Sequence, residues 1–214
     1  MTVLSSLDDS RLSVLLDLRH PLAYLALHPT IDLARDEGLE INWLPIRVPP
    51  LNAPSTAGPD DDRGIRHRRI RAQAIGREIE TYANAQGLVL RDYYRDADPT
   101  AAYVGWLWLR EQRPERLEDY LTEIFRAYWA LELDPGDEKA ISSVIEGLGA
   151  DAAGFEAWAV DRGPASVSAL AEELAERGLG VAPAYLIDDE VFLGRQHLPM
   201  IRWMLGGREG RGPI

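Results

Sequence analysis

The stretch that decides the fold is LSVLLDLRHPLAYLAL, residues 12–27. Its first part, residues 12–18, is a short apolar run typical of a strand buried on both faces. Pro21 then stands where proline suits the first turn of a helix, because its missing N–H would have no partner there. Apolar residues follow at roughly helical spacing up to Ala34, so we expect a helix to begin directly after the strand.

His20 lies at this predicted corner between strand and helix. The first N–H groups of a helix point outward with partial positive charge, so such a corner suits a thiolate or a carboxylate. The same field disfavours a protonated imidazole, and we expect His20 to be mostly neutral at neutral pH until an anion binds. His20 is therefore the candidate catalytic residue.

Composition and charge narrow the class of protein. The chain has 214 residues, 46% of them hydrophobic, enough for one large domain or one domain with an insertion. Its formal net charge of −12 disfavours non-specific nucleic-acid binding. We expect no signal peptide, since residues 1–11 lack a basic start and an apolar core. We expect no membrane span either, since no apolar run approaches about 20 residues. A cytoplasmic protein without nucleic-acid or membrane partners is the expectation.

The chain contains no cysteine. This excludes disulfides, thiolate metal sites, a cysteine nucleophile and dithiol redox chemistry by this chain alone. The four histidines are His20, His28, His67 and His197. None is spaced with another ligand as in H-E-x-x-H, so we assign no metal site.

The order of the predicted elements begins as a β-α-β unit. Residues 41–45, INWLP, read as a second strand, and a unit of this length predicts parallel pairing. Residues 47–62 are rich in Pro, Asn, Ser, Gly and Asp and predict a long loop, either a functional lid or a mobile surface loop. Residues 63–177 have a helical period almost throughout. Residues 184–187 and 191–193 then predict a hairpin.

The hairpin turn is assigned to Asp188 and Asp189, and residues 198–205 predict a closing helix. Strands near both ends with helices between them predict an α/β domain that is discontinuous in sequence. We assign residues 10–62 and 165–206 to this domain and residues 63–164 to an all-helical insertion domain.

Four motifs, taken in order, carry a family resemblance: DLRHPLAYLA at 17–26, EIETYANAQGL at 78–88, VAPAY at 181–185 and FLGRQHL at 192–198. Their order and spacing resemble the DsbA-like branch of the thioredoxin fold. More narrowly, the chain is similar to 2-hydroxychromene-2-carboxylate isomerases and kappa-class glutathione transferases. The resemblance runs over nearly the whole chain and implies a thioredoxin-like fold with an inserted all-helical domain.

The resemblance also implies a site. Pro183 should be cis and face the corner at His20, with the main chain of Ala182 turned toward a bound ligand. The implied cofactor is glutathione or another low-molecular-weight thiol. The implied cofactor-binding positions are Arg19, Pro21, Ala182, Pro183, Gln196 and His197.

Two positions depart from the family pattern. His20 stands where the family has a Ser that bonds the thiol sulfur. An imidazole can donate to a thiolate or act as a general base; the alternative is that catalysis has been lost. Gln196 stands where the family has an acid that holds the glutathione ammonium group, so another thiol, or none, stays an alternative.

Candidate substrate-binding residues come from the inserted segment. RGIRHRRIR, residues 63–71, carries five arginines, and guanidinium groups suit carboxylates. Arg66 and Arg69 are the candidates for a substrate carboxylate; the alternative is a solvated helix face balanced by the acidic residues 60–62. Tyr103 and Trp106 are candidates to face a flat substrate, and core packing is the alternative for each.

The resulting hypothesis is a thiol-dependent isomerase or transferase acting on a small conjugated or aromatic acid. In the isomerase reaction that the resemblance implies, the thiol adds to the conjugated system, allows bond rotation and is expelled. The alternative is a non-catalytic thioredoxin-like binding protein that has lost its Ser or Cys nucleophile. The expected partner is a small-molecule substrate, and a homodimer stays open.

Overall fold

The fold is built on a four-stranded mixed sheet. A computed structural model describes residues 10–54, 56, 58, 62–188 and 190–213. The strands lie in the order β2-β1-β3-β4. Their bounds are β1 Leu12–Leu16, β2 Asn42–Pro45, β3 Ala184–Ile187 and β4 Glu190–Leu193.

The central strand β1 confirms the buried-strand prediction, because all five of its residues are buried. β1 pairs in parallel with β2 and antiparallel with β3, and β4 continues the sheet antiparallel to β3. The predicted parallel β-α-β unit and the predicted hairpin are therefore both present. At the hairpin turn Asp188 has a positive φ of 51°, whereas Asp189 lies outside the described residues.

Helix α1, Pro21–Glu37, connects the two parallel strands. Pro21 occupies the first turn, as predicted, and His20 is the N-cap residue. Gly38 ends the helix with φ 64° and ψ 37°, and its N–H donates to a carbonyl of the last turn. This left-handed conformation is the one that glycine adopts without steric cost.

Between β2 and β3 the chain is helical. The bounds are α2 Arg63–Gln86, α3 Thr100–Gln112, η1 Pro114–Arg116, α4 Leu117–Trp129, α5 Glu138–Gly147, α6 Ala152–Asp161 and α7 Gly163–Glu176. The chain then ends with η2 Arg195–His197 and α8 Leu198–Leu205 after β4. Residues 63–164, all of them described, form no strand, in agreement with the predicted helical period.

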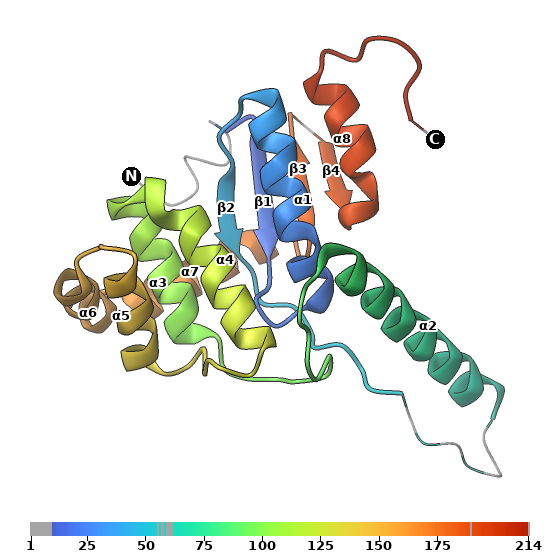
Figure 1. The fold of residues 1–214 in the computed structure, drawn as a ribbon, viewed down its shortest axis with the longest axis horizontal. Helices are drawn as coiled ribbons and strands as arrows, with labels where there is room; N and C mark the ends of the chain where they lie inside the picture. The colour runs from blue at the N-terminus through green and yellow to red at the C-terminus, as the bar shows by residue number, and fades with distance from the viewer. Residues whose placement is uncertain (1–9, 55, 57, 59–61, 189, 214) are drawn as a thin grey trace.

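Helices α3 to α7 gather on one side of the sheet, whereas α2 projects away from the body (Figure 1). The sheet and the gathered helices share one continuous hydrophobic core. Nine consecutive residues of α3, from Ala101 to Leu109, are buried in it. The division into two domains at residues 62 and 164 stays a prediction, since the core crosses it.

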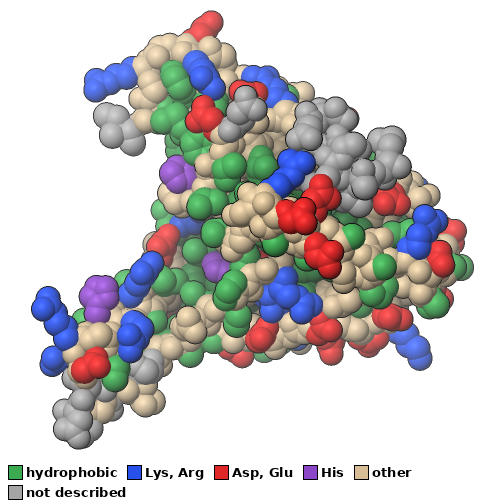
Figure 2. All heavy atoms as spheres, turned by 180° about the vertical axis from the view of Figure 1, so that it is seen from behind, with side chains coloured by type: hydrophobic (Ala, Val, Ile, Leu, Met, Phe, Trp, Pro, Cys, Tyr) green, Lys and Arg blue, Asp and Glu red, His purple; other side chains and the backbone are tan. Residues whose placement is uncertain are grey.

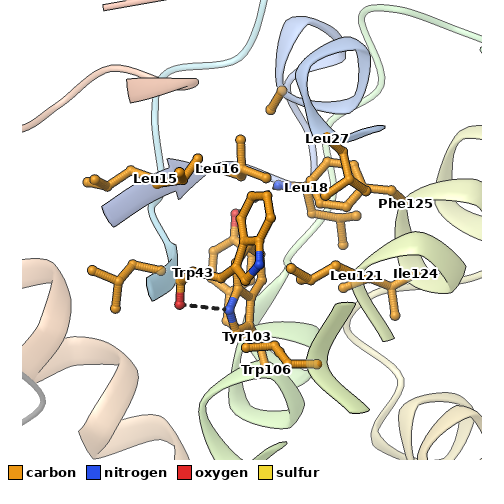
Figure 3. Packing of buried hydrophobic residues seen from close by; sticks show 14 of the residues in the cluster. Leu15, Leu16, Leu18, Leu27, Trp43, Tyr103, Trp106, Leu121, Ile124 and Phe125 are labelled. Atoms are coloured by element: carbon orange, nitrogen blue, oxygen red, sulfur yellow. Dashed lines mark hydrogen bonds between the residues drawn. The ribbon is translucent and has the colours of Figure 1, made fainter. Parts of the chain in front are cut away.

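The middle of the core is aromatic (Figure 3). Trp43 of β2 packs with Trp106 of α3, whose Nε1 donates to the Trp43 carbonyl oxygen at 3.2 Å. Phe125 of α4 stacks on Tyr24 of α1, with ring centroids 5.7 Å apart. Side chains of this size each stabilise the fold by about 1.5–3 kcal/mol when buried, so these contacts fix α3 and α4 against the sheet and α1.

Helix α2 is different, because only Ile79 and Ala83 of its 24 residues are buried. The Asp62 carboxylate caps it by accepting from the Ile65 N–H at 2.7 Å. Its C-terminal part packs on Leu25 of α1, and its basic N-terminal part extends beyond the body. Among the described helices, α2 included, none is long and apolar enough to span a membrane.

Candidate functional site

The corner after β1 and the turn before β3 lie at the same edge of the sheet. Leu15 near the end of β1 pairs with Ala184 at the start of β3. His20 therefore follows the end of β1, and the Ala182–Pro183 peptide precedes the start of β3. These two strand ends are direct neighbours. The Ala182–Pro183 bond is cis, the form that the resemblance implies, and the Pro183 carbonyl accepts from the Gly194 N–H at 2.8 Å.

His20 is held by its backbone rather than by its ring. Its N–H donates to the Asp17 carbonyl at 3.0 Å, and its own carbonyl accepts from the N–H groups of Ala23 and Tyr24 at 2.9 and 3.4 Å. The ring does not cap the helix. Its Nδ1 atom is buried and has no hydrogen-bond partner within the described part of the chain.

Burial lowers the pKa of His20 below its ordinary value. The charge of Asp17 opposes this shift and that of Arg19 reinforces it. The ring is therefore neutral at neutral pH, as the sequence predicts, although the main cause is desolvation rather than the helix field. A neutral imidazole with a free buried nitrogen can accept a proton from an acidic group brought next to it.

Asp17 holds this corner together, and sequence reasoning did not single it out. It is fully buried, and its two carboxylate oxygens accept from the Arg19 N–H and guanidinium at 2.8–3.2 Å. They also accept from the Val48 N–H and the Tyr103 hydroxyl, both at 2.8 Å. Its signal in the sequence is a single acid that directly follows a predicted buried strand.

The prediction that Arg19 binds a cofactor does not agree with its position. Its side chain is only 6% exposed, and its donors go to the Asp17 carboxylate, the Asp96 carboxylate at 2.6 Å and the Val48 carbonyl at 2.9 Å. A buried guanidinium that bonds to two carboxylates and a carbonyl inside the protein is directed at the protein rather than at a ligand. Arg19 is a structural counter-ion for Asp17.

The predicted roles of Tyr103 and Trp106 are corrected in the same way. Their side chains are 2% and 0% exposed, so neither faces a substrate. The Tyr103 oxygen lies 2.8 Å from Asp17 and 3.0 Å from the Ile46 carbonyl, and it accepts from the Leu18 N–H at 3.3 Å. Burial raises the pKa of Tyr103 well above its ordinary value. Both residues are core residues, and Tyr103 completes the Asp17 network.

Three other predicted cofactor positions remain near the corner. Pro21 is buried at the start of α1. Gln196 is exposed, and its Nε2 donates to the Leu193 carbonyl at 2.9 Å. The His197 ring packs on Phe192 with centroids 5.5 Å apart. Gln196 and His197 belong to η2, which contacts α1.

Arg195, the first residue of η2, links this region to the projecting helix. Its guanidinium bonds the Glu78 carboxylate at 2.9 Å and lies 3.4 Å from the centroid of the Tyr82 ring. Both partners are on α2, more than 100 residues earlier in the chain. Sequence reasoning missed Arg195 because neither contact has a local signal.

The arginine-rich segment borders a cavity of about 560 Å³ between α2 and residues 51–53. Arg68, Arg69 and Arg71 line it together with Asn52. The structure thus brings Arg69 into this cavity, whereas Arg66 is not among its lining residues. Figure 2 shows Lys and Arg side chains gathered over the projecting arm at the lower left, next to a hollow in this face.

The cavity lies close to the corner. Two residues of its wall, Leu51 and Ile75, pack in the same small cluster as Leu22 and Leu25 of α1. Leu22 is two residues after His20. The arginine cavity and the first turns of α1 therefore share one apolar cluster.

Similarity to known proteins identifies the family of this chain. The family model of the DSBA-like thioredoxin domain matches residues 12–206. The chain belongs to this family. A curated relative, 2-hydroxychromene-2-carboxylate isomerase from Sphingobium xenophagum, is 25% identical over 187 residues, which are 86% of this chain and 92% of the relative. The predicted thioredoxin-like fold and the predicted family are confirmed.

Solved structures of DSBA-like proteins agree in fold. A 2-hydroxychromene-2-carboxylate isomerase has a TM-score of 0.65 at 21% identity, over 92% of this chain and 95% of that one. A probable DsbA oxidoreductase from Streptomyces coelicolor has a TM-score of 0.68 at 20% identity, over 96% and 93%. The cytosolic disulfide reductase DsbM from Pseudomonas aeruginosa, solved with GSH, has a TM-score of 0.56 at 19% identity, over 92% and 98%.

This DSBA-like chain differs from a disulfide enzyme in its chemistry, because it has no cysteine at all. Thiol–disulfide exchange needs an attacking protein thiolate. Within the described residues there is also no group of three or more His, Asp or Glu side chains placed to hold a metal ion. The functional groups at the corner are the imidazole, the main-chain groups and the nearby guanidiniums.

Proposed function

We propose that this protein is a thiol-dependent isomerase or transferase that acts on a small conjugated or aromatic acid. The observation that carries the proposal is the buried, unpartnered Nδ1 of His20 at the start of α1, at the same sheet edge as Ala182 and Pro183. The relative from Sphingobium xenophagum, named an isomerase of a carboxylate, supports the reaction class. A cytoplasmic location belongs to the same proposal.

The residues at the corner fit a thiol. A buried polar atom without a partner is costly unless a ligand satisfies it, and the His20 Nδ1 atom is one. The main-chain groups of Ala182 precede a strand end and can pair with a peptide-like backbone. Glutathione or another low-molecular-weight thiol would supply a nucleophile that adds to a conjugated bond and leaves again. The structure of DsbM with GSH supports this choice of ligand.

His20 would take the proton that the thiol loses. The neutral ring accepts it at Nδ1, and the resulting imidazolium is then attracted by the sulfur anion, which raises the pKa of His20 in the complex. The N-terminus of α1 stabilises an anion by about 0.3–1 kcal/mol. Since Pro21 has no N–H, the donors at this end are those of the following residues.

The substrate carboxylate would bind at the cavity beside the corner. The guanidiniums of Arg68 and Arg71 have no hydrogen bond or ion pair among the described residues, and both residues line this cavity with Asn52. Arg69 lines the same wall. The predicted partner Arg66 is thus replaced by its neighbours on α2.

Thiol binding tests the first half of the proposal. Calorimetric titration with glutathione, cysteine and coenzyme A measures affinity, and far-ultraviolet absorbance against pH measures the pKa of the bound thiol. We expect saturable binding and a lowered thiol pKa. His20→Ala should abolish that lowering, and His20→Ser should keep part of it because a hydroxyl still donates to sulfur. His67→Ala, an exposed histidine on α2, is the matched control.

The alternative function is a non-catalytic thioredoxin-like binding protein. The absence of saturable binding to any of the three thiols would favour it, as would His20→Ala curves that match the unmodified protein. For the second half, Arg68→Gln with Arg71→Gln should weaken binding of cinnamate more than binding of the neutral cinnamamide. Equal effects on both ligands would indicate that the arginines are only surface charges and do not bind the carboxylate.

A further inference from the structure

A second concavity also borders α1. Its volume is about 430 Å³, and it is bounded by α1, by residues 87–91 after α2 and by α4 with the turn that follows it. These elements meet where the C-terminal end of α2 lies beside α1 (Figure 1). It shares no lining residue with the arginine cavity.

Tyr24 forms part of its wall. The side chain is only 3% exposed, and its ring stacks on Phe125 at an interplanar angle of 24°. Burial raises the pKa of Tyr24, with the charges of Arg126 and Glu123 as smaller opposing and reinforcing causes. Among the described residues, the hydroxyl has no hydrogen bond. The hydroxyl is not one of the fully buried unpartnered atoms, so it reaches the cavity and can donate to an occupant.

The two arginines that line this cavity differ in whether their guanidiniums are already paired with carboxylates. Arg126 is held by two carboxylates, Glu123 at 2.8 Å and Glu132 at 2.7 Å. Arg91 also lines the cavity, and its guanidinium has no ion pair within the described residues. Only its backbone N–H is used, at 2.9 Å from the Trp129 carbonyl. Glu132 also lines the cavity, and its carboxylate is paired with Arg126, so among the described lining residues the charge without an ion pair is the Arg91 guanidinium.

The rest of the wall is apolar enough for a ring. Leu88 and Val89 line it, and Val89 is 54% exposed although it is aliphatic. The His28 ring lies 6.4 Å from that of Tyr24 and completes the α1 side. A cavity of a few hundred Å³ with apolar walls and a few polar groups is the usual form of a small-molecule site.

We propose that this cavity binds a small aromatic monocarboxylate, with the carboxylate between the Tyr24 hydroxyl and the Arg91 guanidinium and the ring over Leu88 and Val89. One unpaired cation and one free hydroxyl match one carboxylate. The Tyr24 N–H donates to the carbonyl of His20, so Tyr24 is linked to His20 through the first turn of α1. The proposal is independent of the thiol chemistry proposed above.

Two-dimensional ¹H–¹⁵N NMR on the full chain tests it, with benzoate as probe and neutral benzamide as its analogue. We expect saturable benzoate shifts at the amides of Tyr24, Leu88 and Val89, and weaker binding of benzamide. Arg91→Gln should raise the benzoate Kd about tenfold through loss of a charge-assisted hydrogen bond. Tyr24→Phe, which keeps the ring, should raise it about threefold.

Two controls separate this site from the arginine cavity and from general charge effects. Arg68→Gln removes a guanidinium of the other cavity, and Arg162→Gln removes one at the exposed end of α6. Both should leave the benzoate titration at Leu88 and Val89 unchanged. Unsaturable shifts, equal affinity for benzoate and benzamide, or insensitivity to Arg91→Gln would each overturn the proposal.

Discussion

Replacement of Asp17 by Asn is the sharpest test of how the corner at His20 is held. Asp17 is fully buried and receives donors from Arg19, Val48 and Tyr103. An Asn side chain is isosteric, but its Nδ2 group would point a donor at atoms that are themselves donors. The substitution also leaves Arg19, only 6% exposed, with one carboxylate instead of two.

The expected loss follows from these contacts. Removing one partner of a buried ion pair costs about 3–5 kcal/mol. Arg19 keeps Asp96 and the Val48 carbonyl, so the lower end, about 3 kcal/mol, is expected. A chain of 150–250 residues loses about 2–4 °C of Tm per kcal/mol. Asp17→Asn should therefore lower the Tm by about 6–12 °C.

Urea unfolding followed by circular dichroism measures this loss, with two variants for scale. Tyr103→Phe removes only the hydroxyl of the network and should cost about 1–3 kcal/mol. Asp98→Asn changes a pair whose side chains are 52% and 67% exposed and should cost less than about 1 kcal/mol. If the free energy of unfolding of Asp17→Asn lies within about 1 kcal/mol of that of the unmodified protein, the network does not stabilise the corner.

Three further predictions concern single residues. The pKa of His20 is lowered in the folded state, so its contribution to the free energy of unfolding is present above about pH 6.5 and is lost as pH falls below that. In urea unfolding, the stability of His20→Gln should therefore fall less steeply below that pH than the stability of the unmodified protein. Parallel curves for the two proteins would contradict this prediction. Trp106→Ala should cost about 3–5 kcal/mol as a core truncation in the same assay, and unchanged stability would restore a surface role. Arg195→Ala should cost about 0.5–1.5 kcal/mol through Glu78 and Tyr82 and speed hydrogen exchange in α2, and unchanged exchange there would show that Arg195 does not tether α2.

Most of the fold was readable because its signals are local. The apolar run of β1, the proline at the start of α1 and the helical period of residues 63–177 each follow from spacing within about 20 residues. The thioredoxin-like assignment needed the order of four motifs along the chain, and the family model over residues 12–206 confirms it. The projection of α2 had no such signal, because its composition does not show what packs against it.

The site was readable only in part, because burial is decided by the whole fold. Arg19 lies beside the predicted corner and Tyr103 in the inserted segment, and both were assigned to ligands. The structure uses both to satisfy Asp17, Tyr103 from 86 residues away in the sequence. A separation of that length leaves no periodic pattern in the sequence. His20, in contrast, lies at the predicted corner between strand and helix, where its neighbours in sequence are also its neighbours in space.

The Asp17 network explains how the chain tolerates a histidine at this corner. The backbone of residues 17–24 is fixed by the Asp17 carbonyl, by Pro21 and by the first turn of α1, and none of these contacts uses the side chain at position 20. A change of that side chain therefore alters the chemistry at the corner and leaves its geometry in place. His20 supplies a proton acceptor where a hydroxyl would supply only a donor to sulfur. Because burial lowers the pKa of His20, the ring is neutral at neutral pH, and in the proposed reaction it would be available to take the proton of a bound thiol.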